Sequence, residues 1–139
     1  MPSINFFEED ISFKLKNKTT VKQWVKATIE AEGYKLKELN YIFCSDQYLL
    51  TINQQYLNHD TYTDIVTFDN SEKDGIIEGD IFISIDRIRE NAAKFSSGEV
   101  NELHRVIIHG VLHLIGYGDK SNSSKKQMRE KEDAYLSLR

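Results

Sequence analysis

Two histidines and an aspartate near the carboxyl end of the chain have the types and spacing of metal ligands. His109 and His113 stand four residues apart in an apolar run, and Asp119 follows after a Gly-Tyr-Gly break. A helix turns by about 100° per residue, so side chains four residues apart lie on one face, one turn apart. Gly116 can end such a helix and Gly118 adds a flexible joint, which would let Asp119 fold back. Two imidazoles and one carboxylate would bind a divalent cation and leave a position for water.

The histidine pair also has a purely structural explanation. Histidines at this spacing occur by chance on the surface or in the core of ordinary helices. The apolar surroundings favour a metal, because two partly buried imidazoles without partners would be costly. From spacing alone, a metal site and a structural pair both remain open.

The residue after the first histidine distinguishes this pattern from that of the common zinc proteases. Proteases of the H-E-x-x-H type use a glutamate there as general base, whereas this chain has Gly110, which cannot accept a proton. Glycine inside a helix costs about 1 kcal/mol relative to alanine. We expect either that another backbone or the substrate comes close to Gly110, or that the helix packs tightly on a strand there.

Hydrophobic periodicity predicts strands and helices that alternate along the chain. One or two strands are expected in residues 5–13, and a helix capped by Thr20 should run to about Glu32. The apolar stripe expected on this helix consists of Val21, Trp24, Val25, Thr28 and Ile29. A second helix, capped by Ser45 or Asp46, should extend through Tyr56.

The rest of the chain continues this alternation. Further strands are expected at 39–45, 64–68 and 79–84, and further helices at 86–95, 99–116 and 123–138. The last helix has four apolar anchors: Met128, Ala134, Tyr135 and Leu138. We therefore predict a single compact α+β domain over residues 1–139, in which a small sheet packs with helices and the metal site lies at the end of a helix.

Composition restricts the setting of this domain. The chain has 139 residues and a net charge of −4, an ordinary globular balance with enough length for a core. The single cysteine, Cys44, lies in an apolar run and is expected in the core; it suits a reducing cytoplasm. We see no signal peptide and no apolar run of about 18 residues that would span a membrane.

The negative charge is a poor match to a general nucleic-acid binder, which is usually basic. A local basic patch would still allow RNA binding. Five lysines near the amino terminus form one such cluster, although an ordinary solvated face explains them as well: Lys14, Lys16, Lys18, Lys22 and Lys26.

These motifs together resemble the YbeY family of bacterial endoribonucleases, also called rRNA maturation factors. The family signature is close to H-G-x-L-H-L-x-G-Y-D-H, and residues 109–119 read HGVLHLIGYGD. A family segment like Y-R-x-K-D-x-x-T-D-V-L-S-F matches residues 56–68, YLNHDTYTDIVTF, and a G-D-I-x-I-S strand matches residues 79–84. The late M-x-x-x-E pattern matches Met128 and Glu132. The resemblance covers roughly residues 50 to 135.

The resemblance implies a mixed four-stranded sheet and one zinc ion held by three histidines. His109 and His113 match the first two ligands, the third family histidine falls on Asp119, and the aspartate before it falls on Gly118. Aspartate is a competent zinc ligand but a harder donor than imidazole. We therefore expect Zn²⁺, one per chain, with nickel, iron or manganese also open.

A second departure lies upstream of the signature. The family arginine after the tyrosine falls on Leu57, where an arginine could stabilise a phosphate. His59, at a family lysine position, and Arg105, one turn before His109, are the candidates to supply a cation, although each also fits a surface or structural role. Thr63 and Asp64 are candidates to orient a ligand histidine through its second nitrogen, or else cap the loop.

For activity, the resemblance implies metal-dependent, single-strand-specific cleavage of RNA in 16S rRNA 3′-end maturation and ribosome quality control. The catalytic set would be His109, His113 and Asp119 acting through the metal, which lowers the pKa of bound water. Alternatively, the RNA 2′-hydroxyl attacks. The expected partners are single-stranded RNA, the small ribosomal subunit and its proteins, with no membrane, and we expect a cytoplasmic monomer.

Three other functions are compatible with parts of the pattern. A ribosome-assembly factor could keep a structural metal with little catalysis, which Leu57 and the acidic net charge favour. A metalloprotease is disfavoured by Gly110. An iron oxygenase shares the 2-His-1-carboxylate ligand set, but its usual context is a β-barrel, which this chain does not resemble.

Overall fold

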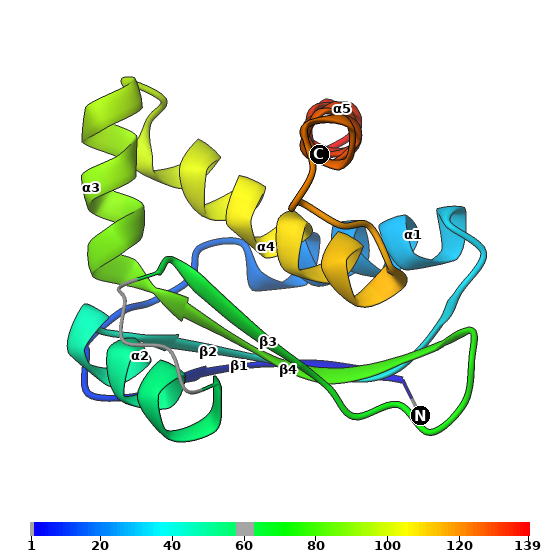
Figure 1. Ribbon diagram of the computed structural model, residues 1–139, viewed down its shortest axis with the longest axis horizontal. Helices are drawn as coiled ribbons and strands as arrows, with labels where there is room; N and C mark the ends of the chain where they lie inside the picture. Colours follow the sequence, from blue (N-terminus) through cyan, green and yellow to red (C-terminus); the bar gives the residue numbers. More distant parts are fainter. Residues whose placement is uncertain (1, 58–62) are drawn as a thin grey trace.

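The structure is a computed structural model that describes residues 2–57 and 63–139 (Figure 1). In chain order the elements are β1 Ser3–Glu8, α1 Lys18–Ala31, β2 Lys35–Cys44, α2 Asp46–Ile52, the π-helical turn η1 Asn53–Leu57, β3 Ile65–Asp69, β4 Ile76–Ser84, α3 Ile85–Phe95, α4 Glu99–Ile115 and α5 Asn122–Leu136. Strands and helices alternate from β1 to α2, the two strands β3 and β4 then follow one another, and three helices complete the chain.

The four strands form one mixed sheet in the order β1-β2-β4-β3. β1 pairs with β2 and β2 pairs with β4 in parallel, whereas β3 runs antiparallel to β4 at the edge. Parallel neighbours need crossover connections, which α1 provides between β1 and β2. The predicted α+β domain with a mixed four-stranded sheet is confirmed.

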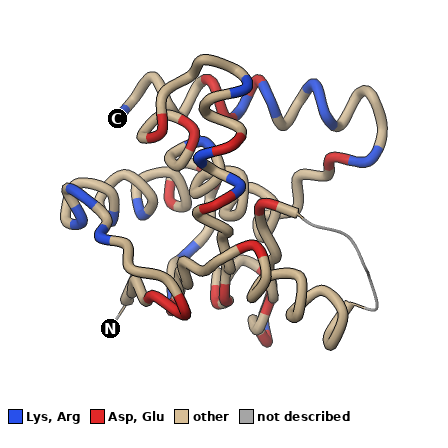
Figure 2. The backbone as a smooth tube through the Cα atoms, turned by 90° about the vertical axis from the view of Figure 1, so that its left-hand side faces the viewer, with Lys and Arg blue, Asp and Glu red and all other residues tan. Residues whose placement is uncertain are grey.

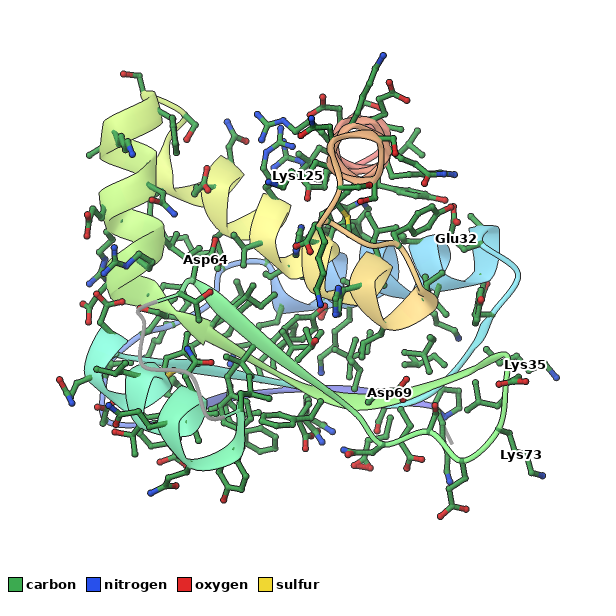
Figure 3. The ribbon with its side chains drawn as sticks, in the orientation of Figure 1. Glu32, Lys35, Asp64, Asp69, Lys73 and Lys125 are labelled. Atoms are coloured by element: carbon green, nitrogen blue, oxygen red, sulfur yellow. The ribbon has the colours of Figure 1, made fainter. Side chains whose placement is uncertain are left out.

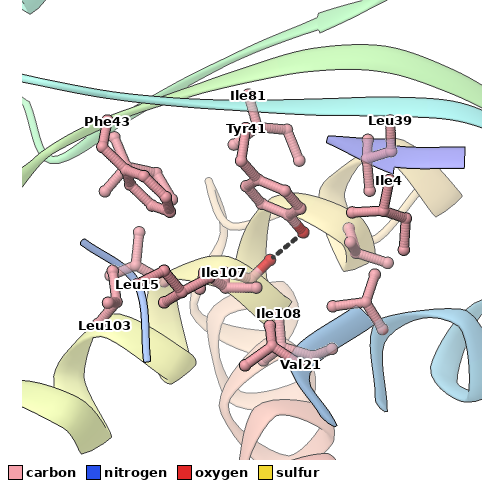
Figure 4. Packing of buried hydrophobic residues seen from close by; sticks show 14 of the residues in the cluster. Ile4, Leu15, Val21, Leu39, Tyr41, Phe43, Ile81, Leu103, Ile107 and Ile108 are labelled. Carbon is pink, nitrogen blue, oxygen red and sulfur yellow. Dashed lines mark hydrogen bonds between the residues drawn. The ribbon is translucent and has the colours of Figure 1, made fainter. Parts of the chain in front are cut away.

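The larger core lies between the sheet and helices α1 and α4 (Figure 4). Alternate residues of β2 point to this side, so Leu39, Tyr41 and Phe43 are buried there. The hydroxyl of Tyr41 donates a 3.0 Å hydrogen bond to the carbonyl oxygen of Ile107 in α4. This contact links the helix that carries His109 and His113 to a central strand of the core.

A smaller core lies on the other side of the sheet, where α2 packs. It contains Cys44, Leu49, Ile52 and Val66. Cys44 is fully buried, which confirms its predicted place in the core, and burial raises its thiol pKa to about 12. A thiol with so high a pKa is inert as a nucleophile.

Two local predictions need correction. Helix α1 begins after Asn17, which adopts the left-handed conformation at φ 58°, and Thr20 lies inside the helix rather than capping it. The predicted buried stripe of this helix is nevertheless correct in all five residues. At the other end of the chain, two of the four predicted apolar anchors lie outside the core: Ala134 is exposed on α5, and Leu138 follows α5 with 71% of its surface exposed.

Helix α5 packs on α4 rather than on the sheet and forms a separate layer (Figure 1). A capping box formed by Ser121 and Ser124 begins the helix, and Met128 is buried on its apolar side. The indole Nε1 of Trp24 in α1 donates a 2.8 Å hydrogen bond to the carbonyl of Tyr135 near the end of α5. Within the described part of the chain, no helix combines the length and hydropathy needed to cross a membrane.

Candidate metal centre

A polar cleft opens between α4, α5 and the start of β3. Its volume is ≈ 420 Å³. The three predicted ligands His109, His113 and Asp119 all line it, as do Thr63, Asp64, Arg105, Arg129 and Glu132. The fold therefore brings the residues of the histidine motif together with segments from three other parts of the chain.

His109 is the most constrained of the predicted ligands. Its side chain is 21% exposed, and its Nδ1 atom lies 2.7 Å from Oε2 of Glu132 in α5. Its Nε2 atom lies 3.5 Å from Oδ2 of Asp119. One ring nitrogen is thus held by a carboxylate while the other faces the cleft, as in the carboxylate–histidine arrangement of protein metal sites.

The loop after α4 returns Asp119 to the cleft. Gly116 ends α4 with φ 124°, a conformation that a side chain would disfavour. The hydroxyl of Tyr117 then donates a 2.5 Å hydrogen bond to Glu32, the residue that follows α1. Lys131 and Tyr135 of α5 also bind the Glu32 carboxylate. Figure 3 shows Glu32 below α5, where it joins α1, the loop and α5.

His113 lies one turn beyond His109 and is exposed at the mouth of the cleft. Among residues 2–57 and 63–139, no three His, Cys, Asp or Glu side chains are gathered closely enough to hold a metal as they stand. His109 and Asp119 already converge, and the side chain of His113 is free to change rotamer because it is exposed. The donor chemistry of the three residues fits a transition metal.

The carboxylates around His109 control its charge. Burial disfavours the imidazolium, but the hydrogen bond and charge of Glu132, with smaller effects of Asp64 and Asp119, outweigh it and raise the pKa of His109. Burial also raises the pKa of Asp64, against the opposing effect of His109. Figure 3 shows Asp64 at the start of β3, on the side of α4.

Arg105 lines the cleft, but its positive charge is already paired with two carboxylates. Its guanidinium binds Glu132 at 2.8 Å and Asp133 at 2.7 Å. Because Glu132 in turn binds His109, Arg105 is the first member of a chain Arg105–Glu132–His109. This arrangement supports the structural role considered for Arg105 from the sequence.

Glu132 is the cleft residue whose contact with His109 sequence reasoning missed. The partner of His109 Nδ1 is Glu132, not Thr63 or Asp64; Thr63 instead donates a 3.4 Å hydrogen bond to the carbonyl of Ile65. A signal was present, since Met128 and Glu132 stand four residues apart on one helical face and Met128 is buried. A carboxylate on the buried face of a helix needs a cationic or hydrogen-bonding partner.

Three further residues of interest lie away from the ligands. Gly110 faces the sheet, where an added Cβ would lie 2.9 Å from Cδ1 of Ile81 and 3.0 Å from Cδ1 of Ile65, so tight helix–strand packing explains it. Leu57 ends η1, 38% exposed, and does not line the cleft. His59 lies outside the described residues.

Comparison with known proteins identifies the family. The family model described as "Endoribonuclease YbeY" matches residues 3–138. The chain belongs to the YbeY family. A Cytophaga hutchinsonii protein named Endoribonuclease YbeY is 55% identical over 137 residues, covering 99% of this chain and 96% of the relative. A Flavobacterium psychrophilum protein of the same name is 52% identical, covering 95% and 94% of the two chains.

A solved structure supports the YbeY-family fold. The solution structure of the Thermotoga maritima protein TM1509 matches with a TM-score of 0.68 and 29% sequence identity, over 97% of this chain and 87% of that one. The family membership expected from the histidine motif is thus confirmed.

Proposed function

We propose that this YbeY-family chain is a metal-dependent endoribonuclease that cleaves single-stranded RNA. The observation that carries the proposal is the convergence of His109, His113 and Asp119 on one polar cleft, with His109 held by Glu132. The relatives named Endoribonuclease YbeY support the reaction. Residues 1–139 would act as a single catalytic domain.

Electrostatics of the cleft support metal dependence. Four carboxylates line it, from Asp64, Glu102, Asp119 and Glu132, against two arginines, one of which is already paired. A phosphodiester would be repelled by this surplus of negative charge unless a cation were bound. A bound divalent cation supplies Lewis-acid polarisation and activates water at neutral pH.

Asp119 in place of the family histidine would make the ligand set two imidazoles and one carboxylate. The third ligand is then anionic, which favours a divalent cation and tolerates harder metals than a three-histidine site does. Zn²⁺ is the first candidate, with Ni²⁺, Fe²⁺ and Mn²⁺ as alternatives. Glu132 would orient His109 by holding its Nδ1 atom, and Arg105 would hold Glu132.

The cleft favours an unpaired substrate. Its volume of ≈ 420 Å³ falls among sites that enclose a small ligand, commonly about 300–1,000 Å³. A single unstacked nucleotide can enter such a cleft, whereas a duplex presents only its outer surface. The family resemblance directs the proposal further, to 16S rRNA 3′-end maturation and ribosome quality control on the small ribosomal subunit, by a cytoplasmic monomer.

One second function is supported by a specific observation. Arg105 is neutralised by two carboxylates, and Leu57 replaces the family arginine. Weak phosphate stabilisation would fit a ribosome-assembly factor that keeps a structural metal and cleaves RNA slowly. Metal content alone does not separate the two functions, whereas a cleavage rate does.

The test combines metal content with RNA cleavage. Elemental mass spectrometry of the purified protein should find about one transition metal per chain, lost in Asp119→Ala and retained in Asp119→His, which restores the family ligand. The same three proteins are then given an end-labelled single-stranded RNA. Metal-dependent cleavage by the wild type and by Asp119→His, absent in Asp119→Ala, supports the nuclease. Metal without cleavage supports the assembly factor, and no metal after reconstitution contradicts both.

A further inference from the structure

A second hollow adjoins the polar cleft that His109, His113 and Asp119 line, and it extends along α5. Its volume is ≈ 740 Å³, and it shares Phe95, Glu102, Arg105 and Arg129 with the cleft. It extends past the shared residues to Asn101 and to the segment after α5. A chain molecule that enters the metal cleft can therefore continue into the second hollow without leaving the protein surface.

The arginines of the second hollow differ in what they already bind. Arg105 is neutralised by Glu132 and Asp133. Arg139 donates hydrogen bonds to Asn101, to the ring of His104 and to a backbone carbonyl oxygen. The amide and the carbonyl are uncharged, and burial and the charge of Arg139 lower the pKa of His104. Its positive charge is therefore not cancelled by a carboxylate.

Arg129 is the more significant of the two remaining cations. It lines both hollows, is exposed on α5, and forms no ion pair or hydrogen bond with any residue that the structure describes. Arg129 follows Lys125 and Lys126 in the first half of α5, and Figure 2 shows Lys and Arg positions along this part of the backbone. A guanidinium in this position can form a bidentate pair with a phosphate.

An aromatic ring stands across the same border. Phe95 ends α3 with 62% of its surface exposed, and it too lines both hollows. The ammonium of Lys94 lies 5.4 Å from the centre of its ring, which adds positive charge on that side. Exposed aromatic rings beside cations are the platforms on which single-stranded nucleic acids stack their bases.

We propose that the second hollow is a subsite for the nucleotide next to the scissile phosphate of a single-stranded RNA. Arg129 pairs with the phosphate at the border between the two hollows, Phe95 stacks on the adjoining base, and Arg139 faces the next phosphate. Arg129 would thereby supply the positive charge that is missing at position 57, where Leu57 replaces the family arginine. This inference rests on the proposed function, because it requires RNA in the metal cleft.

Binding of a single-stranded RNA analogue tests the subsite. The probe is a fluorescein-labelled 2′-O-methyl octauridylate, titrated with the protein as purified at several salt concentrations, and checked afterwards on a gel for integrity. Arg129→Gln should weaken binding at least about fivefold and reduce the slope of log affinity against log salt by roughly 0.7, the loss of one phosphate contact. The matched control Lys126→Gln removes a charge from the same helix but from neither hollow, and should leave both values unchanged.

The stacking contact has its own readout. In an oligonucleotide that carries 2-aminopurine, stacking on Phe95 should quench the fluorescence on binding. Phe95→Ala should abolish the quenching and weaken binding at least about fivefold, whereas Phe7→Ala, at another exposed ring, should not. Circular dichroism of every variant confirms that it is folded.

The outcomes separate the subsite from the proposed function. If the wild type binds and cleaves RNA but Arg129→Gln and Phe95→Ala behave like their controls, the subsite is wrong and the nuclease stands. If the wild type neither binds nor cleaves single-stranded RNA, the proposed function fails, and the subsite fails with it. If it binds duplex RNA as tightly as single-stranded RNA, base stacking on Phe95 is wrong.

Discussion

Atom Nδ1 of His109 in α4 lies 2.7 Å from Oε2 of Glu132 in α5, so the packing of these two helices decides how the first histidine of the motif is oriented. The other carboxylate oxygen of Glu132 accepts from Arg105. The side chain of Glu132 is only 7% exposed, and both of its oxygens are satisfied by these partners.

Glu132→Gln should weaken metal binding by about 10- to 100-fold without removing a ligand. The neutral amide holds the His109 ring less firmly and no longer increases its basicity. Competition with a chromophoric chelator measures the affinity. The control is Glu130→Gln, two residues away on the exposed side of α5. Equal metal affinity in the wild type and Glu132→Gln would contradict the orienting role.

Arg105→Gln should lower both stability and metal affinity but leave the salt dependence of RNA binding unchanged. It removes two charge-assisted hydrogen bonds, at 2.8 Å to Glu132 and 2.7 Å to Asp133, which we expect to cost about 1–3 kcal/mol in the free energy of unfolding. Urea denaturation measures the first effect and a salt titration the last. A lower salt slope, like that expected for Arg129→Gln, would instead show that Arg105 contacts phosphate.

Glu32→Gln should destabilise the protein in a pH-dependent way. Burial opposes ionisation of Glu32, but the hydrogen bonds from Tyr117, Tyr135 and Lys131 prevail and lower its pKa below the ordinary 4.5. A lowered pKa in the folded state adds stability that is complete above pH 4.5 and is lost as the pH falls through the folded value.

The free energy of unfolding of Glu32→Gln should therefore be lower than that of the wild type by about 1–3 kcal/mol at pH 7, and the difference should shrink below pH 4.5. Urea denaturation at a series of pH values measures it. Glu30→Gln is the control, since Glu30 is exposed and its ion pair, at 3.9 Å from Lys26, lies on the surface, where such pairs contribute little to stability. A difference that stays constant with pH would contradict the ionised Glu32 network.

Gly110→Ala should destabilise the protein by about 1 kcal/mol while metal binding is retained. The added methyl would lie 2.9 Å from Cδ1 of Ile81, and overpacking outweighs the better helix propensity of alanine. Ile81→Val removes that Cδ1 atom, so the double variant should be less destabilised than the sum of the two single variants. Additive free energies, or loss of metal with stability intact, would contradict packing as the reason for glycine.

Much of the fold could be predicted from the sequence because local patterns carry it. The buried stripe of α1 follows from helical spacing, and alternation along β2 and β4 identifies the residues that face the core. Helix α4 could be bounded by its breakers, with Gly98 before it and Gly116 after it. Element ends were less predictable: Asn17 begins α1 through a left-handed backbone that the sequence pattern does not reveal.

The candidate site divides in the same way. His109, His113 and Asp119 could be chosen from the sequence, because one helical turn and one glycine-rich loop relate them. Glu132 and Glu32 could not be assigned their roles, since their partners lie 23 residues away in the case of His109 and 85 residues away in the case of Tyr117.

The sequence by itself therefore determined which residues can act as metal donors, because donor chemistry and helical spacing are local properties. Only the tertiary structure decided which carboxylate holds His109, which arginine is neutralised and which arginine remains uncommitted. Those outcomes depend on how α5 packs on α4. That packing results from the burial of apolar side chains such as Met128, and the hydrophobic effect does not depend on which charged residues it brings together. The packing sets the local charges only by bringing Glu132 and Arg129 to the cleft, and Asp133 and Arg129 to the second hollow.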